Sequence, residues 1–541
     1  MMETLARPLA RPAGQLASRV PAAPRPVSWP WLRSRYFLLV LFSLGLPFIC
    51  LAGRPLYGDV WWVLANARAL VQQGSLLTAD PLSFAPHTPS YVDAQWLAQL
   101  TYYGAYQLLG LAGVSTLNGV TVTLAFAILL HLGWQRTGQV WAPCAAGLVG
   151  VFIAMPFMHP RAQTLSLVVF AAAAWLLAAQ RLSLPRLLAL GAVEAAWANM
   201  HGSFFLGPLL TLTLAAGEVI EAVADRRWRS LLRSPRVHFL AAAFTVQLVG
   251  SLLNPYGADL YAYAVRLSGD PMLRKYVTEW APTSAGDWLE AGFFVAAALE
   301  VAVVAVARRR LMGDLLVLGL FAVLALGAVR NVPWWALISP PFVAPYLAQV
   351  QLPAWLARAG RACVPRRENV RTNLVRAGVL GLVAVSALPW SRAGNPLLGV
   401  EQRTHVDNIY PVNAVEFLRS HDFGSRIFEQ QPWGAYLDWA LWPKYQPMVD
   451  SAIEVHPKEV WLDVLALNQG RASWEQLLDR YDVDVLLLSK EDQQPLIEAA
   501  SRSPRWQRVY DDEMAEIYIR AGTAAELTPT SVDLRGSWSR G

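Results

Sequence analysis

The sequence contains little charge. Charged residues make up 16% of its 541 positions, and 55% of the residues are hydrophobic. Soluble domains typically contain roughly a quarter charged residues. A soluble chain this apolar could not cover its surface with polar side chains, and the apolar excess also excludes an intrinsically disordered chain. We therefore expect a polytopic α-helical membrane protein.

Cysteine and lysine are also scarce. The three cysteines, Cys50, Cys144 and Cys363, are far apart and lack metal-ligand spacing, so nothing predicts disulfides or a cysteine-bound metal. The net charge of +6 comes mainly from arginines in short clusters between apolar segments. Such clusters are typical of cytoplasmic loops rather than of a nucleic-acid-binding surface, so we expect no nucleic-acid partner.

Apolar segments of about 17–25 residues predict about eleven transmembrane helices within a domain at 36–390. The weaker segment 95–112 contains Gln95, Gln99 and Gln107 among aromatic residues, and it predicts an amphipathic helix at the membrane interface. The eleven predicted spans are about 36–53, 113–133, 141–157, 159–181, 184–199, 201–223, 237–253, 288–307, 312–329, 331–350 and 373–390.

The arginine clusters predict the orientation. With a cytoplasmic N-terminus and eleven spans, the clusters at 226–236, 308–310 and 358–371 all lie on the cytoplasmic side, as the positive-inside rule requires. A twelfth span at 95–112 would move most of them outside. Residues 1–35, rich in Arg, Pro and Ala, then form a disordered cytoplasmic tail, and 54–112 form the first outer loop.

After the last predicted span the composition changes. Residues 398–521 carry charges throughout and alternate short strand patterns (SRIFEQ, QPMVD, VDVLLLS, WQRVY, AEIYIR) with helical ones, which predicts an extracytoplasmic α/β domain. One helix is expected to begin at Pro411 and another to be capped by Ser473. Residues 522–541 are expected to form a disordered tail.

Polar residues out of place beside the spans fall on the predicted outer side. Ionisable groups at membrane depth are costly and tend to mark functional sites. Their convergence predicts a polar cavity that opens outward. The candidate site residues are Asp59, Asp80 and Asp93 in the first outer loop, with His159, Arg161, His201, Arg330 and Asn331 in the short outer loops.

Several candidates also have local structural readings. Asp59 could cap the helix that follows it, Asp80 in TADPLSF could belong to an Asp-Pro turn, and Asp93 could cap the interface helix. His159 and His201 could be ordinary loop residues. A buried guanidinium in the very short loop at Arg330 is harder to explain without an anionic partner.

The residue types point to an anionic lipid substrate. Arg161 and Arg330 carry forked donors that suit phosphate oxygens, and Asp59 could deprotonate an acceptor hydroxyl while the lipid phosphate leaves. In a site of low dielectric the arginines would stabilise the charge that grows on the departing phosphate.

At these residues the sequence resembles the C-type glycosyltransferase (GT-C) superfold, which includes protein O-mannosyltransferases, the oligosaccharyltransferase catalytic subunit and bacterial aminoarabinose transferases. A first span is followed by an aspartate and a long outer loop. The segment from DVWW to the Trp-Leu helix is similar to the opening of a bacterial family of such proteins. The later blocks HPRAQTLSL, ANMHGSFFLG, LLNPYG, YVTEWAP and VRNVPWWALISPP also fit, so the resemblance covers roughly 36–350.

The resemblance implies a polyprenyl-phosphate sugar as donor. It implies Asp59 as the catalytic base, and Asp80 as a second acid that binds a metal ion or the acceptor, which leaves a divalent cation open as a cofactor. The sequence departs from the family at Val63, where many relatives have His, and at Ala94-Gln95, which replace a common His-Glu pair. A metal site or acid pair at those positions would be missing here.

The leading hypothesis is therefore an inverting glycosyltransferase of the bacterial inner membrane that acts on its extracytoplasmic face. Its partners would be the lipid bilayer, a polyprenyl-phosphate sugar donor and an acceptor glycan, lipid or protein. Two alternatives stay open: a transporter or flippase for an anionic lipid-linked glycan, and a non-catalytic, membrane-anchored partner. The paired halves with broken helices that many transporters show are not evident in this sequence.

Overall fold

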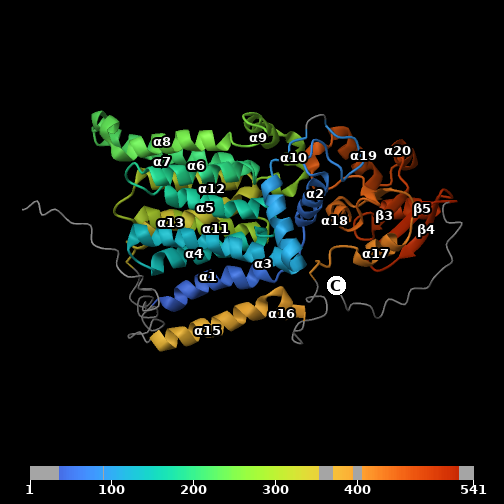
Figure 1. Ribbon diagram of the computed structural model, residues 1–541, viewed down its shortest axis with the longest axis horizontal. Helices are drawn as coiled ribbons and strands as arrows, with labels where there is room; N and C mark the ends of the chain where they lie inside the picture. The colour runs from blue at the N-terminus through green and yellow to red at the C-terminus, as the bar shows by residue number, and fades with distance from the viewer. Residues whose placement is uncertain (1–35, 89–90, 352–369, 394–404, 523–541) are drawn as a thin grey trace, which may run out of the picture.

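A computed structural model shows a bundle of long helices beside a smaller unit built around a five-stranded sheet (Figure 1). The structure describes residues 36–88, 91–351, 370–393 and 405–522. The predicted tail at 1–35 and nearly all of that at 522–541 lie outside the described residues.

The long helices follow the predicted apolar segments. Each satisfies its own backbone hydrogen bonds, which a segment in lipid must do. Four helical segments are long and apolar enough to cross a membrane: Trp96–Thr137, Gly202–Ala224, Trp288–Val306 and Val370–Ala387. The fold is thus that of a polytopic membrane protein, whereas the count of eleven spans stays a prediction. The bundle helices are α1 (Phe37–Ala52), α3 (Trp96–Thr137), α4 (Trp141–Ala154), α5 (Ala162–Leu176), α6 (Leu184–Ala198), α7 (Leu206–Ala224), α8 (Pro235–Ser251), α11 (Trp288–Val306), α12 (Met312–Gly327), α13 (Val332–Leu347) and α15 (Val370–Ala387).

The predicted interface helix and the following span belong to one helix, α3, with a break at Gly110. This glycine has φ 64° and ψ −161°, a backbone conformation that disfavours residues with a Cβ atom. The non-helical backbone at Gly110 means that α3 joins two helices across a kink, close to the boundary predicted between 95–112 and 113–133.

Short helices cover the end of the bundle that faces the sheet unit. Helix α2 is buried on almost every side, from Val60 to Ala67, because it lies between α3 and a helix of the C-terminal unit. Figure 1 shows α2, α9 and α10 at this junction. The short elements are α2 (Val60–Gln73), α9 (Asp259–Gly269), α10 (Pro271–Tyr276), α16 (Pro389–Ala393), η2 (Met155–Phe157), η3 (Gly202–Phe205), η5 (Thr278–Trp280) and η6 (Val329–Asn331), while η4 (Trp228–Arg233) connects α7 to α8 at the opposite end.

The C-terminal unit has the predicted α/β character. The strand order is β2-β1-β3-β5-β4. Strands β2, β1 and β3 are parallel to one another, and β5 pairs antiparallel with β3 on one side and with β4 on the other. All five expected strands are present, and β3 is buried on both faces. The elements are α17 (Val412–Ser420), β1 (Arg426–Glu429), α18 (Gln431–Leu441), β2 (Gln446–Pro447), η8 (Ile453–Val455), α19 (Lys458–Asn468), α20 (Trp474–Arg480), β3 (Val485–Ser489), α21 (Gln494–Arg502), β4 (Trp506–Asp511) and β5 (Ala515–Arg520).

Two details of the C-terminal unit differ from expectation. The side chain of Ser473 makes no capping bond to α20, so its predicted capping role is wrong. The helices α18, α19 and α21 were not expected. Helix α18 contains the segment QPWGAYLDW and lies against α2, so the C-terminal unit is fastened to the first outer loop.

The contact between bundle and C-terminal unit is apolar and continuous. The Trp61 ring lies 5.9 Å from that of Tyr410 and 5.2 Å from that of Tyr436, centroid to centroid. A parallel β-bridge joins Leu56 to Val406. Aromatic contacts of this kind add to the free energy gained by burying the rings themselves. The C-terminal unit therefore fixes the backbone on both sides of Asp59.

Candidate functional site

Asp59 lies between α1 and α2, and its carboxylate lies near Arg161 and Ser451. It makes no side-chain capping bond to α2, so the alternative reading as a helix cap is wrong. The preceding Gly58 has φ 76°, and its N–H donates to the Tyr410 hydroxyl at 2.8 Å. The Asp59 side chain keeps 46% of its surface exposed although protein surrounds it, as expected for a group that lines a recess.

Arg161 bridges Asp59 to a second acid, Glu279. Its Nη1 atom lies 2.6 and 2.7 Å from the two carboxylate oxygens of Glu279 and 4.0 Å from Oδ2 of Asp59. Arg161 precedes α5, and Glu279 lies in η5, so two outer loops meet beside Asp59. The guanidinium is almost wholly buried, and its Nη1 is already bound to Glu279. Arg161 therefore has fewer donors left for a phosphate than the sequence led us to expect.

The two acids titrate in opposite directions. Burial raises the pKa of Asp59, and the neighbouring Glu279 raises it further, against the opposing effect of Arg161. Burial would also raise the pKa of Glu279, but Arg161 and other nearby groups outweigh it and lower that pKa to about 2. Glu279 therefore stays ionised, whereas Asp59 has a greater affinity for a proton than an ordinary aspartate. Such an arrangement suits a general base.

Arg330 is a cation without an ion-pair partner. Its guanidinium stacks over the Trp280 ring at 4.1 Å, and among the described residues no carboxylate oxygen lies within 4.0 Å of it. Burial lowers its pKa, and the charges of Glu279 and Asp59 oppose that effect. A forked, desolvated donor with free hydrogen-bonding capacity is the expected receptor for a phosphate group.

The two predicted histidines are neutral at this site. Burial lowers the pKa of His159 to about 3, and it lowers that of His201 well below its usual range. His159 lies against Tyr57, with 5.0 Å between ring centroids, and its Nδ1 has no partner among the described residues. The Nδ1 atom of His201 accepts the N–H of Ser203 at 3.1 Å and caps η3. His201 therefore orders its loop rather than supplying a positive charge.

Asn331 also has a local role. Its Nδ2 donates to the Leu324 carbonyl at the end of α12, at 2.9 Å. This bond fixes the loop that carries the neighbouring Arg330, and the expected contact of Asn331 with substrate stays a prediction. The carbonyl of Arg330 in turn accepts a hydrogen bond from Nε2 of Gln163 at 2.9 Å.

The hydrogen bonds of Asp80 and Asp93 are made with residues outside the Asp59 cluster. Asp80 accepts from the N–H of Leu82 at 2.9 Å in its turn, and its role as a second acid that binds a metal ion or the acceptor stays a prediction. Oδ1 of Asp93 accepts from Gln95 N–H and from Gln99, so the carboxylate is bound locally, just before α3, which begins at Trp96. Burial raises the pKa of Asp93 to about 7.

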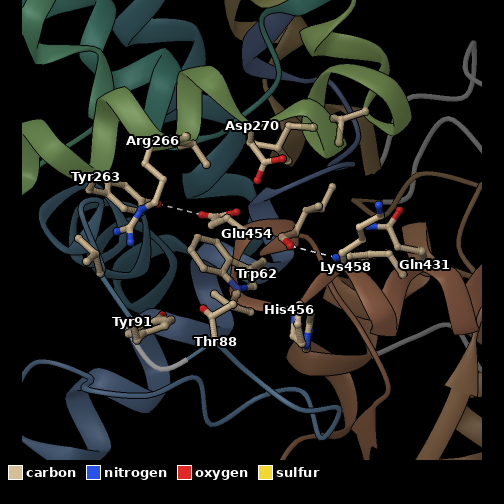
Figure 2. Close-up of a pocket in the computed structure, with 18 of the residues that line it drawn as sticks. Trp62, Thr88, Tyr91, Tyr263, Arg266, Asp270, Gln431, Glu454, His456 and Lys458 are labelled. Atoms are coloured by element: carbon tan, nitrogen blue, oxygen red, sulfur yellow. Dashed lines mark hydrogen bonds between the residues drawn. The ribbon is translucent and has the colours of Figure 1, made fainter.

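A cavity of about 480 Å³ lies between the outer loops and the C-terminal unit (Figure 2). Trp62, Tyr91 and Tyr263 form aromatic parts of its wall, and Asp93 reaches it from the start of α3. Glu454, from the C-terminal unit, accepts the Tyr263 hydroxyl at 3.0 Å. The mixture of aromatic faces and a few fixed polar groups is typical of a small-molecule or glycan pocket.

Glu454 connects this cavity to the Asp59 cluster. Burial raises its pKa, while Arg330 is close enough to lower it and Asp59 close enough to raise it. Sequence reasoning missed both Glu279 and Glu454. Glu279 is the one acid in the block YVTEWAP and could have been chosen on that ground, whereas nothing in the sequence relates residue 454 to residue 59.

The residues beside Asp59 do not fit a divalent cation. Such an ion prefers several free carboxylate or carbonyl oxygens. Here the Arg161 guanidinium already lies against both oxygens of Glu279 and near Asp59. Its positive charge neutralises the acidic pair that a metal ion would need, and no step at Asp59 is therefore assigned to a metal.

Comparison with known proteins rests on structure. No family model matches the sequence, and no curated protein is significantly similar to it. An oligosaccharyltransferase from Archaeoglobus fulgidus matches with a TM-score of 0.50 and 13% identity, over 91% of this chain and 75% of that one. The same organism's AglB, in complex with an inhibitory peptide and a dolichol-phosphate, matches with a TM-score of 0.51 and 12% identity, over 90% and 74%.

A bacterial structure matches over nearly its whole length. ArnT from Cupriavidus metallidurans, bound to undecaprenyl phosphate, has a TM-score of 0.50 and 14% identity, over 90% of this chain and 98% of that one. At sequence identities this low, the structural similarity shows a common fold and no more. The resemblance expected from the sequence is thus confirmed, and the chain has the GT-C fold of polytopic membrane glycosyltransferases, with a C-terminal soluble unit.

Proposed function

We propose that this protein is an integral membrane glycosyltransferase that moves a sugar from a polyprenyl-phosphate donor to an acceptor hydroxyl. One observation carries the proposal: the unpaired guanidinium of Arg330 lies near Asp59, the carboxylate whose pKa is raised. A phosphate receptor and a proton acceptor are the two groups that this reaction requires. The shared fold with AglB and ArnT, whose structures contain dolichol-phosphate and undecaprenyl phosphate, supports the same donor class.

The chemistry is a single displacement at the anomeric carbon. Arg330 binds the phosphate oxygens of the donor, and Arg161 contributes positive charge from its place between Glu279 and Asp59. The acceptor oxygen attacks while Asp59 takes its proton. The bond between the anomeric carbon and the phosphate oxygen breaks, and the polyprenyl phosphate leaves with the electron pair. One displacement inverts the configuration, and the guanidinium stabilises the charge that develops on the leaving phosphate.

The cavity of Figure 2 is the proposed acceptor site. It meets the Asp59 cluster at Glu454, so an acceptor held by Trp62 and Tyr263 could present a hydroxyl to Asp59. Aromatic faces flanked by hydrogen-bonding groups favour a glycan or another polyhydroxylated acceptor.

The proposed location is the bacterial inner membrane, with the N-terminus in the cytoplasm and the C-terminal unit outside. Eleven spans with this orientation keep the arginine clusters inside. They also place Asp59, Arg161 and Arg330 at the extracytoplasmic ends of their helices, where a lipid phosphate lies at the interface.

Donor turnover is the direct test. The full chain, reconstituted in lipid nanodiscs, is incubated with a panel of undecaprenyl-phosphate sugars and with membrane extract as the source of acceptor. The released undecaprenyl phosphate and the sugar-labelled product are measured by mass spectrometry. We expect one donor to be consumed in proportion to the product formed, with inversion at the anomeric carbon. Asp59→Asn serves as the inactive control.

The alternatives give different results. A flippase would move a labelled lipid-linked sugar across a proteoliposome membrane and release no undecaprenyl phosphate. A non-catalytic partner would do neither and would retain only binding through the C-terminal unit. Either result, with every donor of the panel intact, would overturn the proposal.

A further inference from the structure

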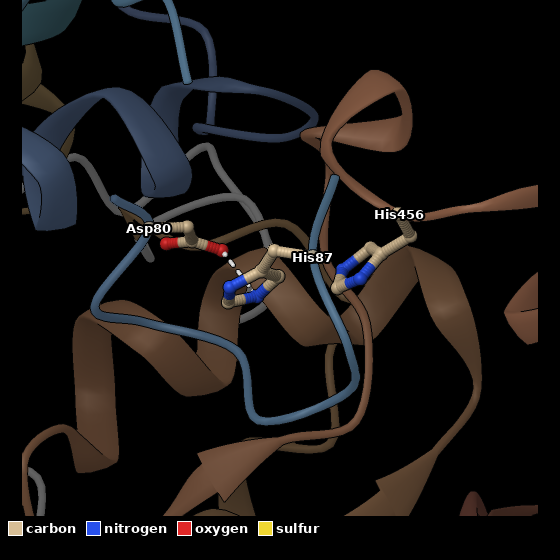
Figure 3. Close-up of side chains that lie close together, drawn as sticks. All are labelled: Asp80, His87 and His456. Carbon is tan, nitrogen blue, oxygen red and sulfur yellow. Dashed lines mark ion pairs between the residues drawn. The ribbon is translucent and has the colours of Figure 1, made fainter. Parts of the chain in front are cut away.

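A second group of polar side chains lies where the first outer loop meets the C-terminal unit. Asp80 and His87 come from the loop, and His456 from the segment that follows η8 (Figure 3). Their nearest ligand atoms all lie within 4.8 Å of one another, and Asp80 Oδ2 is 3.5 Å from His87 Nε2. Two side chains of the first outer loop and one of the C-terminal unit thus bring potential ligand atoms close together.

The hydroxyl of Ser83 lies beside these three atoms. Its Oγ is 2.5 Å from Asp80 Oδ2, 3.1 Å from His87 Nε2 and 3.3 Å from His456 Nε2. Asp80 and His456 are almost wholly buried. Any unsatisfied polar atom here therefore costs free energy.

Two acceptor atoms of the cluster face each other across Ser83. His456 Nδ1 is 3.2 Å from the Pro86 carbonyl, which can only accept, so Nδ1 carries the proton and the Nε2 of a neutral ring is a bare acceptor. Asp80 Oδ2 is a second acceptor. Both atoms face Ser83, which has a single proton to donate. Without an ion, the second acceptor depends on a proton at Nε2 of His87, which lies 3.5 Å from Asp80 Oδ2, whereas a cation would be bound by Asp80 Oδ2 and by both Nε2 atoms.

We propose that Asp80, His87 and His456 bind a zinc-class divalent ion. One carboxylate and two imidazoles are ligands that suit Zn²⁺. With bonds of about 2.0–2.1 Å, tetrahedral ligands are about 3.4 Å apart, close to the 3.5 Å between Asp80 and His87. The widest separation in the group contracts when a side chain rotates inward. The fourth position is open to the Ser83 hydroxyl or to water.

The surroundings resemble those of established zinc sites. The Nδ1–H of His456 faces a backbone carbonyl, the usual second contact of a ligating histidine. Asp80 is held by its own turn through the N–H of Leu82. Two backbone bonds, from Phe84 to Pro447 and from Ala85 to Met448, join the same loop to β2 and the residue after it. The ligand positions are therefore already ordered.

The ion would cross-link the first outer loop to the C-terminal unit. His456 lies two residues after Glu454, and both line the cavity of Figure 2. Zinc bound at His456 would hold this segment against the first outer loop. The site is structural, and its metal content is independent of whether the protein transfers a sugar.

Metal binding is measured on the full chain in nanodiscs. The protein is stripped with a chelator, titrated with Zn²⁺ and analysed by inductively coupled plasma mass spectrometry, and Co²⁺ is added separately as a spectroscopic probe. The variants are His87→Gln and His456→Gln. His421→Gln is the matched control, because His421 lies in the same unit and the hydrogen bonds of its side chain are local. Ser83→Ala distinguishes a metal site from a hydrogen-bond network centred on Ser83, because it removes the hydroxyl and keeps the three proposed ligands.

We expect about one Zn²⁺ per chain, visible absorption of tetrahedral Co²⁺, and a more than ~100-fold loss of affinity in both ligand variants. The control should bind as the parent does, and Ser83→Ala should still bind zinc through water. Circular dichroism identifies any variant that fails to fold. If both ligand variants fail to fold, the zinc stoichiometry of the parent alone decides whether the proposal stands. Absence of stoichiometric zinc from the folded parent, or tetrahedral Co²⁺ absorption that survives in both ligand variants, would overturn the proposal.

Discussion

Replacing Arg330 by glutamine should weaken binding of the lipid phosphate. The guanidinium stacks on Trp280 and has no carboxylate partner within 4.0 Å among the described residues, so its donors are available to a ligand. Hydrogen bonds to a charged group contribute about 1.5–3 kcal/mol. A loss of this size weakens binding by roughly 10–150-fold. Because Glu279 and Asp59 remain, the variant site also becomes more negative toward an anion.

The assay is equilibrium binding of undecaprenyl phosphate to the full chain in nanodiscs. Arg330→Lys keeps the charge without the fork and the flat stacking surface, so it should fall between the parent and Arg330→Gln. Arg419→Gln, an exposed arginine of the C-terminal unit, is the control for charge alone. If Arg330→Gln bound undecaprenyl phosphate as tightly as the parent does, the assignment of this residue to the phosphate would be refuted.

Two further predictions concern the neighbours of Asp59. Gly58→Ala should lower the transfer rate more than it lowers thermal stability. The φ of 76° at this position disfavours a side chain, and a Cβ atom would lie 3.3 Å from the His159 ring. An unchanged transfer rate would contradict the prediction. Glu279 has its pKa lowered to about 2 from an ordinary 4.5, so it stabilises the fold above pH 4.5 and loses that effect as the pH falls toward 2. Melting temperatures across this range should therefore fall more steeply for the parent than for Glu279→Gln, and parallel curves would contradict the prediction.

Much of the fold follows from local pattern. Apolar length located the bundle helices, and strand-like alternation located all five strands, because both signals lie within short segments. Helix α18 was harder to predict. It is buried against α2, so its apolar residues face several directions and do not form one stripe. The break at Gly110 falls close to the predicted boundary at 112, because the glutamines of the first segment and the unbroken apolar run of the second distinguish the two helices in the sequence.

The candidate site could be predicted only in part. Asp59, Arg161 and Arg330 were recognised because charge at membrane depth is costly. Their partners were not, since the pairing of Arg161 with Glu279 joins residues 118 positions apart. Likewise His456 approaches Asp80 only because the C-terminal unit folds back onto the first outer loop. Such contacts depend on tertiary packing, and a single sequence carries no signal for them.

The central claim is that Asp59 is the general base of a sugar transfer. Asp59→Asn removes the proton acceptor while Glu279 still pairs with Arg161, so the fold and phosphate binding should persist. Asp259→Asn, an exposed acid in the first turn of α9, is the control. Transfer by Asp59→Asn, measured with a donor that the parent consumes, should fall by about 10²–10⁴-fold with undecaprenyl phosphate binding unchanged. Transfer at the parent rate would contradict the account.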